Sequence, residues 1–324
     1  MFARCQAGVV NQFASSTRRA SFFCASLFTT ISCLLLLAAL APRAQAANWI
    51  VHAQPSRLVN GAPVLFQVKA PISLESLTGT WLGHQVSFSF DPATKSWFAL
   101  AGVSLETTPG AYTLELTGEQ PTSKNAASRM AFSSKFTVFS GKYPKTEVKL
   151  KVEGKFTEPS PEQQKQIEEA QAVKKDYLNR VTPDRTWSGQ FTAPADAEIS
   201  DVFNSQRVFN GKTLSSHLGL DFRVPRGTPV AAMNSGTVLL ARFLYYEGNF
   251  VVIDHGQGLL TLYLHLSEFK VKEGDTVKRG QEIGLSGGTG RATGPHLHVA
   301  VRWQGTYLDP AQLLQLPLPD VGKS

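Results

Sequence analysis

The chain has 324 residues, of which 42% are hydrophobic and 18% charged, enough to bury the cores of about two domains. Wholesale disorder is excluded by this composition. The net charge of +7 is unevenly placed, because residues 1–46 hold four arginines and no acidic residue. Without that segment 28 basic side chains face 25 acidic ones, a net charge of +3, and no block of Lys and Arg remains. Nucleic acid is therefore not an expected partner.

Residues 1–46 have the features of an export signal. Arg18 and Arg19 precede an apolar run over residues 22–41, and Ala44-Gln45-Ala46 supplies the small-x-small pattern of a cleavage site. The run is long enough for a membrane anchor, which is the competing interpretation, but the cleavage pattern directly after it favours a cleaved signal peptide. No other run of about 18 apolar residues follows, so no membrane span is expected after cleavage. The expected location is the periplasm or the outside of the cell.

All three cysteines, Cys5, Cys24 and Cys33, lie in this same segment. The mature chain is therefore expected to contain no thiol, which excludes disulfide bonds, cysteine nucleophiles and cysteine-ligated zinc. A cysteine-free exported chain suits an oxidising compartment such as the periplasm.

Residues 47–145 are predicted to form a β-sandwich-like domain. Short alternating runs are separated by turn signals such as Asn60-Gly61 and Pro109-Gly110. The predicted strands include residues 64–68, 86–90, 112–116 and 132–139. No constellation of reactive side chains occurs there, and His52 and His84 are isolated. We interpret this part as a positioning or binding module.

Residues 146–192 are predicted to form a linker that contains one helix. Ser160 is a good N-cap, Pro161 suits the first helical position, and Gln163 completes a capping box. The helix is expected over about residues 161–180, with a thin apolar stripe, and Pro183 ends it. A polar helix between two β-rich parts is typical of a connector that packs along one of them.

Residues 193–310 are predicted to form a second β-rich domain, followed by a tail over 311–324, so the fold is expected to be mainly β. Alternating runs predict strands over residues 237–243, 250–254, 259–264, 282–285 and 297–301. Residues 271–277, followed by Gly280-Gln281, are predicted to form two short strands that turn around glycines, as in small barrel-sandwich folds. Five of the seven histidines lie in this domain.

Three predicted strands each present histidines on the face that is not hydrophobic. Side chains alternate along a strand, so His217 and Asp221 share one face of the segment 216–222, with Gly219 between them. His296 and His298 point the same way on the next such strand, about 7 Å apart. His265 is expected on a polar face together with Tyr263.

Four histidines and one aspartate converge on one cleft if these strands are neighbours. Nitrogen and carboxylate ligands without sulfur suit a zinc ion with three protein ligands and one open position, which is the catalytic arrangement. The remaining histidines would serve as acid–base groups or orient the ligands. Any one of these histidines alone would be expected in the core or on the surface, but three such faces within 82 residues favour a site.

The segment from about residue 195 to 310 resembles the LytM-type zinc peptidases, also called M23 or lysostaphin-like peptidases. The resemblance rests on the HxxxD of His217 and Asp221, on Tyr263-Leu264-His265-Leu266, and on the GPHLH motif over residues 294–298. Glycine turns at residues 227, 256, 274 and 280 and the sequence Gly288-Thr289-Gly290-Arg291 support it. The β module and helix before this segment look like the N-terminal region of some exported members.

The resemblance implies that one zinc ion per chain is held by His217, Asp221 and His298, and that His265 and His296 are the catalytic pair that does not bind the metal. It gives His255 no catalytic part. One departure is visible, because Phe203-Asn204 stands where many relatives have Phe-Gly ahead of an arginine, here Arg207. This loss of a glycine is expected to alter a loop at the edge of the cleft and leave the metal site intact.

The resemblance also implies that peptidoglycan is the substrate, and we expect a D,D-endopeptidase that cuts D-Ala–diaminopimelate cross-links. Arg291, in a glycine-rich loop, is a candidate partner for a substrate carboxylate. The alternative is a non-catalytic murein-binding regulator that activates amidases, although such relatives have usually lost residues that are all present here. A third hypothesis is a general secreted protease for glycine-rich proteins. The N-terminal region is expected to be able to hold the enzyme latent.

Overall fold

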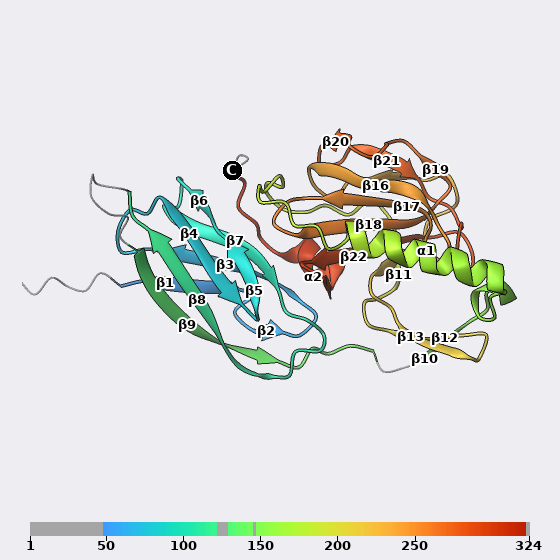
Figure 1. The fold of residues 1–324 in the computed structure, drawn as a ribbon, viewed down its shortest axis with the longest axis horizontal. Coiled ribbons are helices and arrows are strands. Elements are labelled where there is room, and N and C mark those ends of the chain that lie inside the picture. Colours follow the sequence, from blue (N-terminus) through green and yellow to red (C-terminus); the bar gives the residue numbers. More distant parts are fainter. Residues whose placement is uncertain (1–47, 122–128, 145–146, 322–324) are drawn as a thin grey trace, which may run out of the picture. The chain divides into compact units, whose positions relative to one another are not determined.

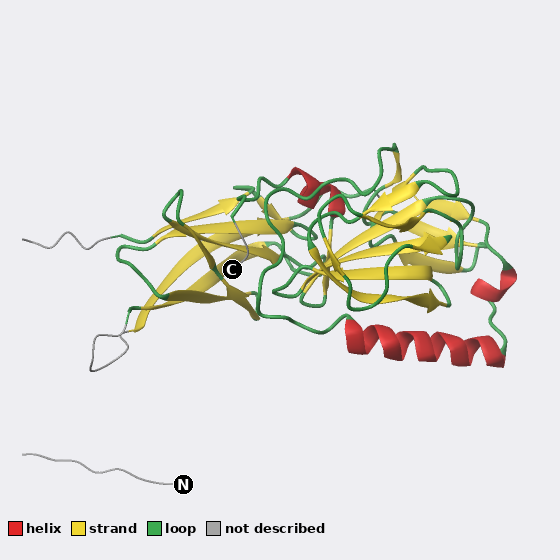
Figure 2. Ribbon diagram, turned by 90° about the horizontal axis from the view of Figure 1, so that it is seen from above, coloured by secondary structure: helices red, strands yellow, loops and turns green. Residues whose placement is uncertain are grey.

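The computed structural model describes residues 48–121, 129–144 and 147–321 (Figures 1 and 2). The predicted signal peptide and its three cysteines lie outside these residues. Within the described part of the chain, neither helix combines the length and the apolar composition needed to cross a membrane.

The N-terminal part is made of two β-sheets that pack face to face. One sheet has the order β1-β3-β7-β6 and the other the order β2-β9-β8-β4-β5. The strands of the first are β1 (Ile50–Gln54), β3 (Pro63–Lys69), β7 (Ser96–Gly102) and β6 (Ser89–Asp91). Those of the second are β2 (Leu58–Val59), β9 (Arg129–Phe139), β8 (Gly110–Glu119), β4 (Ser76–Trp81) and β5 (His84–Ser87).

Aromatic side chains fill the space between these two sheets, as expected for a sandwich. The ring of Phe66 on β3 lies 5.1 Å from that of Trp81 on β4 and 5.2 Å from that of Phe136 on β9. The prediction of one strand over residues 86–90 is wrong, because the chain changes sheets at Phe88 and forms β5 and β6 instead. The prediction of a mainly β fold is confirmed.

Helix α1 (Pro161–Tyr177) follows the short strand β10 (Glu147–Leu150) and a 3₁₀ turn over Gly154–Phe156. Its capping box is complete, since the Ser160 hydroxyl accepts from the Gln163 amide and the Gln163 side chain accepts from the Ser160 amide. The helix ends three residues before the predicted end. Its buried Ala170 and the adjoining Leu178 pack against Leu240, Leu244 and Phe250 of the sheet beside it (Figure 2).

The C-terminal part is centred on one large sheet of order β11-β14-β22-β18-β17-β16-β20. These strands are β11 (Ile199–Asp201), β14 (Leu220–Phe222), β22 (Leu297–Trp303), β18 (Leu259–Leu266), β17 (Gly248–Asp254), β16 (Gly236–Leu244) and β20 (Thr276–Val277), with β23 (Thr306–Leu308) beside β22. A second sheet contains β15 (Pro229–Ala231), β21 (Glu282–Leu285) and β19 (Glu268–Phe269); a third pairs β10 with β12 (Gln206–Phe209) and β13 (Thr213–Ser216). Helix α2 (Pro310–Gln315) comes last.

The prediction of two short strands over residues 271–277 is wrong in its first half. Only Thr276–Val277 form a strand, because the residues before them make a turn. In that turn the Lys272 amide donates to the Asp275 carboxylate at 2.9 Å, and the Asp275 amide donates to the Lys272 carbonyl at 3.1 Å. Backbone donors that bond inside a turn cannot join a second strand.

The two faces of the large sheet are used differently. Leu297, Val299 and Val301 on β22 point into a large hydrophobic cluster that also contains Phe66 and Trp81 of the N-terminal sheets. The opposite face, with Leu262 and Ala300, is covered in part by α1. The polar residues of the site lie on the part of this face that α1 does not cover. The domain boundaries at residues 145 and 193 stay a prediction.

Candidate metal centre

His217 lies in the short link between β13 and β14, almost completely buried. Its Nδ1 donates to the Val202 carbonyl at 2.9 Å, so its Nε2 is left with a free lone pair. The prediction of one strand over 216–222 is wrong for its first half, since β14 begins only at Leu220. As a result Leu218 does not join Leu220 and Phe222 in the core and instead lines a pocket.

Asp221 and His298 are paired residues on the adjacent strands β14 and β22. The Oδ1 of Asp221 lies 2.8 Å from Nδ1 of His298 and 3.1 Å from Nε2 of His217, and the two imidazole nitrogens are 2.9 Å apart. Gly219 makes room for this arrangement, because a Cβ there would stand 2.5 Å from both His298 Nε2 and the Val299 carbonyl. The space that a side chain would take at Gly219 is thus filled by the imidazole of His298.

The electrostatics of this triad favour an ionised Asp221 carboxylate beside a neutral His298 imidazole. Burial by itself raises the pKa of Asp221, but the adjacent His217 and His298 rings outweigh it and hold that pKa far below its usual range. Burial lowers the pKa of His298 to about 4, although Asp221 opposes this shift. Deprotonated carboxylate and neutral imidazole are the forms that bind metal ions.

The triad fits a metal ion of the zinc type. Its three ligand atoms all lie within 4.8 Å of one another, and they come from two imidazoles and one carboxylate. Ligands 2.0–2.2 Å from a tetrahedral zinc stand about 3.3 Å apart, close to the separations found here. Electron-pair donors that converge in this way repel one another unless a proton or a metal cation lies between them.

His265 lies at a β-bulge, and this corrects the prediction that it shares a polar face with Tyr263. Between the pairs Asn249–Leu266 and Val251–Tyr263, β18 has one residue more than β17. His265 takes up the extra length with a φ of 64° and donates its amide to the Glu247 carbonyl at 2.9 Å. The bulge reverses the alternation, so the imidazole lies on the face of Leu262 and Leu264, whereas Tyr263 is buried in the core.

Strain of this kind is informative about function. A left-handed φ is uncommon outside glycine, and it persists where the surrounding structure holds it in place. Here His265 Nδ1 donates to the Thr289 carbonyl at 2.8 Å, while the Thr289 hydroxyl accepts from the Asn249 amide at 2.9 Å and donates to the Leu266 carbonyl at 2.8 Å. The loop at Thr289 therefore fixes both the bulge and the ring.

His296 is the fifth residue of the group and precedes β22. Its ring centre lies 4.8 Å from that of His265, and its Nε2 is 3.9 Å from Oδ2 of Asp221. Its Nδ1 donates to the Gly294 carbonyl at 2.9 Å. The structure thus brings together all five residues that the sequence singled out, from three separate segments.

Backbone carbonyls set the tautomers of three of these rings. His217, His265 and His296 each give their Nδ1 proton to a carbonyl, which leaves Nε2 of each as the nitrogen available for chemistry. Burial, together with the neighbouring His296 and His298, lowers the pKa of His265 well below its usual value. A neutral His265 with Nε2 unprotonated can accept a proton.

Sequence reasoning missed the part played by Arg207 and Asp201. Arg207 on β12 donates to Oδ2 of both Asp201 and Asp221, so it holds the Asp221 oxygen that His217 and His298 do not contact. Asp201 also lies 3.5 Å from His217 Nδ1. Arg207 was noted only as part of a motif, because nothing in a single sequence shows that β12 reaches the carboxylate of β14.

Asn204 keeps the loop conformation that a glycine would provide. Its φ is 61°, in the left-handed region that asparagine tolerates better than most residues, and its amide donates to the His217 carbonyl at 2.6 Å. The expected alteration of this loop relative to the relatives with glycine stays a prediction.

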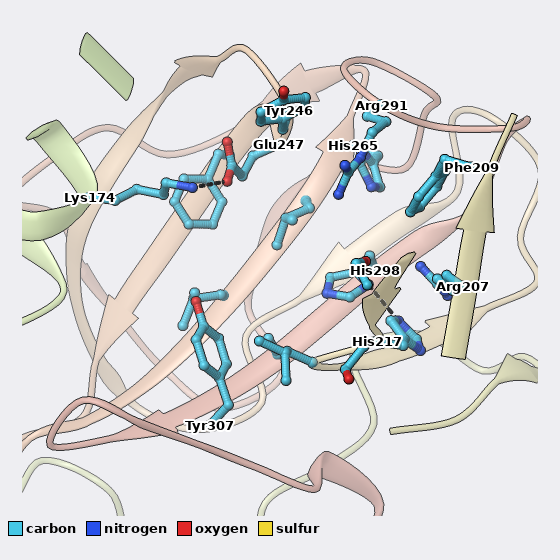
Figure 3. Close-up of a pocket in the computed structure, with 17 residues that line it drawn as sticks. Lys174, Arg207, Phe209, His217, Tyr246, Glu247, His265, Arg291, His298 and Tyr307 are labelled. Atoms are coloured by element: carbon cyan, nitrogen blue, oxygen red, sulfur yellow. Dashed lines mark hydrogen bonds and ion pairs between the residues drawn. The ribbon is translucent and has the colours of Figure 1, made fainter. Parts of the chain in front are cut away.

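A pocket of about 200 Å³ is lined by His217, His265 and His298 (Figure 3). Near the histidines its wall includes Arg291, whose guanidinium lies over the rings of Phe209 and Tyr246, 4.3 and 4.7 Å from their centres. Leu262, Leu264 and Ala300 form an apolar stretch of its wall, and Lys174, Glu247 and Tyr307 line the side opposite Arg207 and His217 (Figure 3). A neighbouring pocket reaches His296 and Asp221 from the side of Val148 and Leu150.

The other three histidines lie apart from this group. His52 is exposed on β1, and His84 contacts the ring of Trp303 at 5.0 Å. His255 is fully buried, donates Nδ1–H to the Ser235 carbonyl at 2.8 Å and has Thr261 Oγ1 at 2.8 Å from Nε2. These contacts agree with a structural role for His255.

We expect the buried neutral His255 to make stability depend on pH. Burial lowers the pKa of His255 from 6.5 to about 4, so the unfolded chain binds a proton between these values and the folded chain does not. The free energy of unfolding should be unaffected by this residue above pH 6.5 and should fall, by up to about 3 kcal/mol, as the pH drops towards 4. Urea unfolding at several pH values should show a shallower dependence for His255→Asn than for the wild type. His52→Ala is the control, and equal slopes for His255→Asn and wild type would contradict the assignment.

Comparison with known proteins agrees with this geometry. Residues 215–310 match peptidase family M23. The segment is 50% identical over 108 residues to the peptidoglycan DD-endopeptidase ShyA of Vibrio cholerae, which covers 32% of this chain and 25% of ShyA. It is 43% identical over 105 residues to the DD-carboxypeptidase/endopeptidase Mpg of Neisseria meningitidis, covering 32% of this chain and 24% of Mpg. The matches therefore span only about a quarter of these curated relatives.

A solved structure extends the similarity to the N-terminal part. The crystal structure of a Pseudomonas aeruginosa protein described as a peptidase M23 superposes with a TM-score of 0.59 at 29% sequence identity. The likeness covers 79% of this chain and 94% of that one, more than the segment that matches the family.

Proposed function

Residues 215–310 form a peptidase family M23 domain, and from this premise we propose that the chain is a zinc-dependent endopeptidase that hydrolyses peptide cross-links of peptidoglycan. D-Ala–diaminopimelate is the proposed bond, in line with the names of the relatives from Vibrio and Neisseria. One observation carries the proposal: a His-Asp-His triad lies beside two further imidazoles, and these five residues line two pockets that share His265. The proposed place of action is the periplasm or the outside of the cell.

His217, Asp221 and His298 would hold one zinc ion per chain. When bound, zinc supplies Lewis acidity, which lowers the pKa of water and polarises a carbonyl group. Arg207 donates to Oδ2 of Asp221, and the Val202 carbonyl holds His217 in one tautomer. Both side chains are therefore already oriented for metal binding.

His265 and His296 would carry out the proton transfers. Each has Nδ1 committed to a backbone carbonyl, so Nε2 is the atom that accepts a proton from water or donates one to the developing oxyanion or the leaving amine. Either ring can take either role, since their centres are only 4.8 Å apart. A nucleophile derived from water agrees with a mature chain that has no cysteine.

The proposal is tested by digestion of purified peptidoglycan with the mature protein, with and without a zinc chelator, and mass spectrometry of the released muropeptides. We expect cross-linked dimers to disappear only without the chelator. Intact dimers in both samples would instead favour the non-catalytic murein-binding regulator. A general protease would be indicated by cleavage of glycine-rich proteins at a rate comparable with that of the dimers.

Arg291 is proposed to bind a substrate carboxylate next to the scissile bond. Its guanidinium is held between the faces of Phe209 and Tyr246, and it lines both pockets that meet at the histidines. Burial lowers the pKa of Arg291, which is the mark of a cation that has lost solvation. The carboxylate on the carbon that bears the cross-linking amine of diaminopimelate is a matching anion.

Arg291→Gln is therefore expected to lower kcat/KM for a cross-linked dimer about 10- to 100-fold, the range for hydrogen bonds to charged groups. Zinc content should stay at that of the wild type. Arg291→Lys should recover only part of the loss, because an ammonium group cannot make the paired contact. Steady-state kinetics on a purified dimer checks this, and an unchanged kcat/KM in Arg291→Gln would remove Arg291 from the substrate site.

Latency through the N-terminal region stays a prediction. Val148 and Leu150 of β10 border the pocket beside His296, and Lys174 of α1 borders the other. Val148→Pro is proposed as the test, because proline weakens the parallel pairing of β10 with β12. A rise in activity would support latency, and an unchanged rate would oppose it. Deleting everything before Phe191 is a poorer test, because it also removes the buried Trp187 and Arg185.

A further inference from the structure

The far end of the main pocket holds an ion pair that the proposed chemistry does not use. Lys174 of α1 donates to Oε1 of Glu247, which lies in the turn between β16 and β17 (Figure 3). Both residues line the same pocket as His217, His265 and His298. The connector helix therefore contributes a charged side chain to the space in which the substrate is proposed to lie.

The second carboxylate oxygen of Glu247 is left without a partner. Glu247 is only 9% exposed, and its Oε2 is buried with no hydrogen-bond partner among the described residues. A buried carboxylate oxygen without a donor is costly, and it becomes favourable when a ligand supplies the missing N–H. This oxygen therefore indicates a ligand that brings an ammonium group.

The surroundings add two further requirements on that ligand. Lys174 stands beside Glu247, so the pair presents one cation and one anion, which complements a group that carries both an ammonium and a carboxylate. The wall of the same pocket includes the apolar stretch of Leu262, Leu264 and Ala300, which suits a chain of methylene groups. Tyr307 lines the same pocket. Besides burial, which raises the pKa of its phenol, the charge of Lys174 lowers that pKa and the charge of Glu247 raises it.

We propose that Lys174 and Glu247 form a subsite for the zwitterionic head group of an α-amino acid carried on an apolar side chain. This inference rests on the proposed function, because the stem peptide that ends in the D-Ala of the scissile bond has diaminopimelate just before that D-Ala. The far carbon of this residue carries a free ammonium and a free carboxylate. Its ammonium donates to Glu247 Oε2, its carboxylate accepts from Lys174 Nζ, and its methylenes lie along the apolar stretch.

The subsite is joined directly to the catalytic region. The Glu247 carbonyl accepts the amide of His265, so the residue that binds the head group also holds the bulge that orients the imidazole. If the only role of the Lys174–Glu247 ion pair were to hold α1 on the sheet, it would duplicate contacts that already do so. Ala170 and Leu178 already pack on the sheet, and Arg302 donates to the Leu178 carbonyl at 2.8 Å.

The experiment uses the full mature chain and three cross-linked tetrapeptide dimers. One dimer is native, one has the free amine of the donor diaminopimelate acetylated, and one has the carboxylate of that same carbon amidated. We expect wild type to cleave the native dimer with a kcat/KM about 10- to 100-fold above that of either modified dimer. Glu247→Gln should abolish most of the discrimination against acetylation, and Lys174→Met most of the discrimination against amidation.

Exposed residues of the same helix provide matched controls. Glu169→Gln and Lys175→Met change the same charges on the surface of α1 and should keep both ratios at the wild-type value. Thermal unfolding of all variants shows whether each is folded. The comparison of ratios within one variant also removes any uniform loss of rate through a weakened helix.

The outcomes separate the two proposals. If Glu247→Gln is slower on all three dimers but keeps the wild-type ratios, the ion pair is a structural tie and the subsite is refuted. If wild type cleaves the three dimers equally, the subsite is refuted while the proposed function stands. If wild type leaves all three intact, the proposed function fails and the subsite fails with it.

Discussion

His265→Ala and His296→Ala are expected to lose about 100- to 10,000-fold in kcat while each still binds one zinc ion per chain. The reason lies in the geometry. Neither ring is part of the His-Asp-His triad, but each lies near it and has Nε2 free of the backbone carbonyl that binds its Nδ1. The check is kcat on a purified cross-linked dimer together with metal analysis of the same protein sample.

The control for these variants is His52→Ala, since His52 is exposed on β1 and remote from the cluster. It should match the wild type in both rate and zinc content. Loss of zinc in His265→Ala would mean that this ring is a ligand, and the proposed assignment would be wrong. A double variant of His265 and His296 should lose little more than either single variant, because the two rings act in one proton-transfer sequence.

The composition of the candidate site could be predicted from the sequence because period-2 alternation carries most of the information. On β22 the alternation is regular, and the structure places Leu297, Val299 and Val301 in the core and His298 on the other face, as predicted. The pairing of Asp221 with His298 is different in kind. Which strands pair is determined by contacts between distant parts of the chain. The sequence therefore indicated only that Asp221 and His298 would be close if their two strands were neighbours.

His265 shows where alternation fails. Regular alternation along the strand predicted that His265 shares a polar face with Tyr263. The bulge adds one residue to β18, so the side chain of His265 lies on the opposite face. A bulge in β18 is stabilised by the Glu247 carbonyl and by the loop at Thr289, which come from distant parts of the chain. No local sequence pattern predicts this bulge. The residue was nevertheless identified, because the motif resemblance does not depend on which face the count assigns.

The part played by α1 could not be predicted for a related reason. Its capping box and its start at Pro161 are local features and were predicted. Which sheet it covers depends on packing of Ala170 and Leu178, and only that packing brings Lys174 to Glu247. The connector is therefore part of the pocket wall, which its polar sequence did not indicate.

Replacement of a proposed metal ligand should have the largest effect on the protein as a whole. His217→Ala is expected to contain far less than one zinc per chain under conditions that saturate the wild type, and to have no measurable activity. The physical reason is that two donors, Asp221 and His298, cannot complete the three-ligand site that catalytic zinc requires. Metal analysis and thermal unfolding provide the measurements. Zinc should raise the Tm of the wild type, by binding only the folded chain, and leave that of His217→Ala unchanged.

Gly219→Ala provides a graded comparison in which all three ligands remain. The new methyl group would stand 2.5 Å from His298 Nε2 and from the Val299 carbonyl, so the imidazole or its strand must move. Because the ligand is displaced and not removed, the expected loss of zinc affinity is about 10- to 100-fold, the scale found when the orientation of a ligand is disturbed. Excess zinc should then restore activity to Gly219→Ala but not to His217→Ala. A Gly219→Ala protein with wild-type zinc affinity would show that the strand yields at this point, and that His298 does not depend on the close approach of glycine.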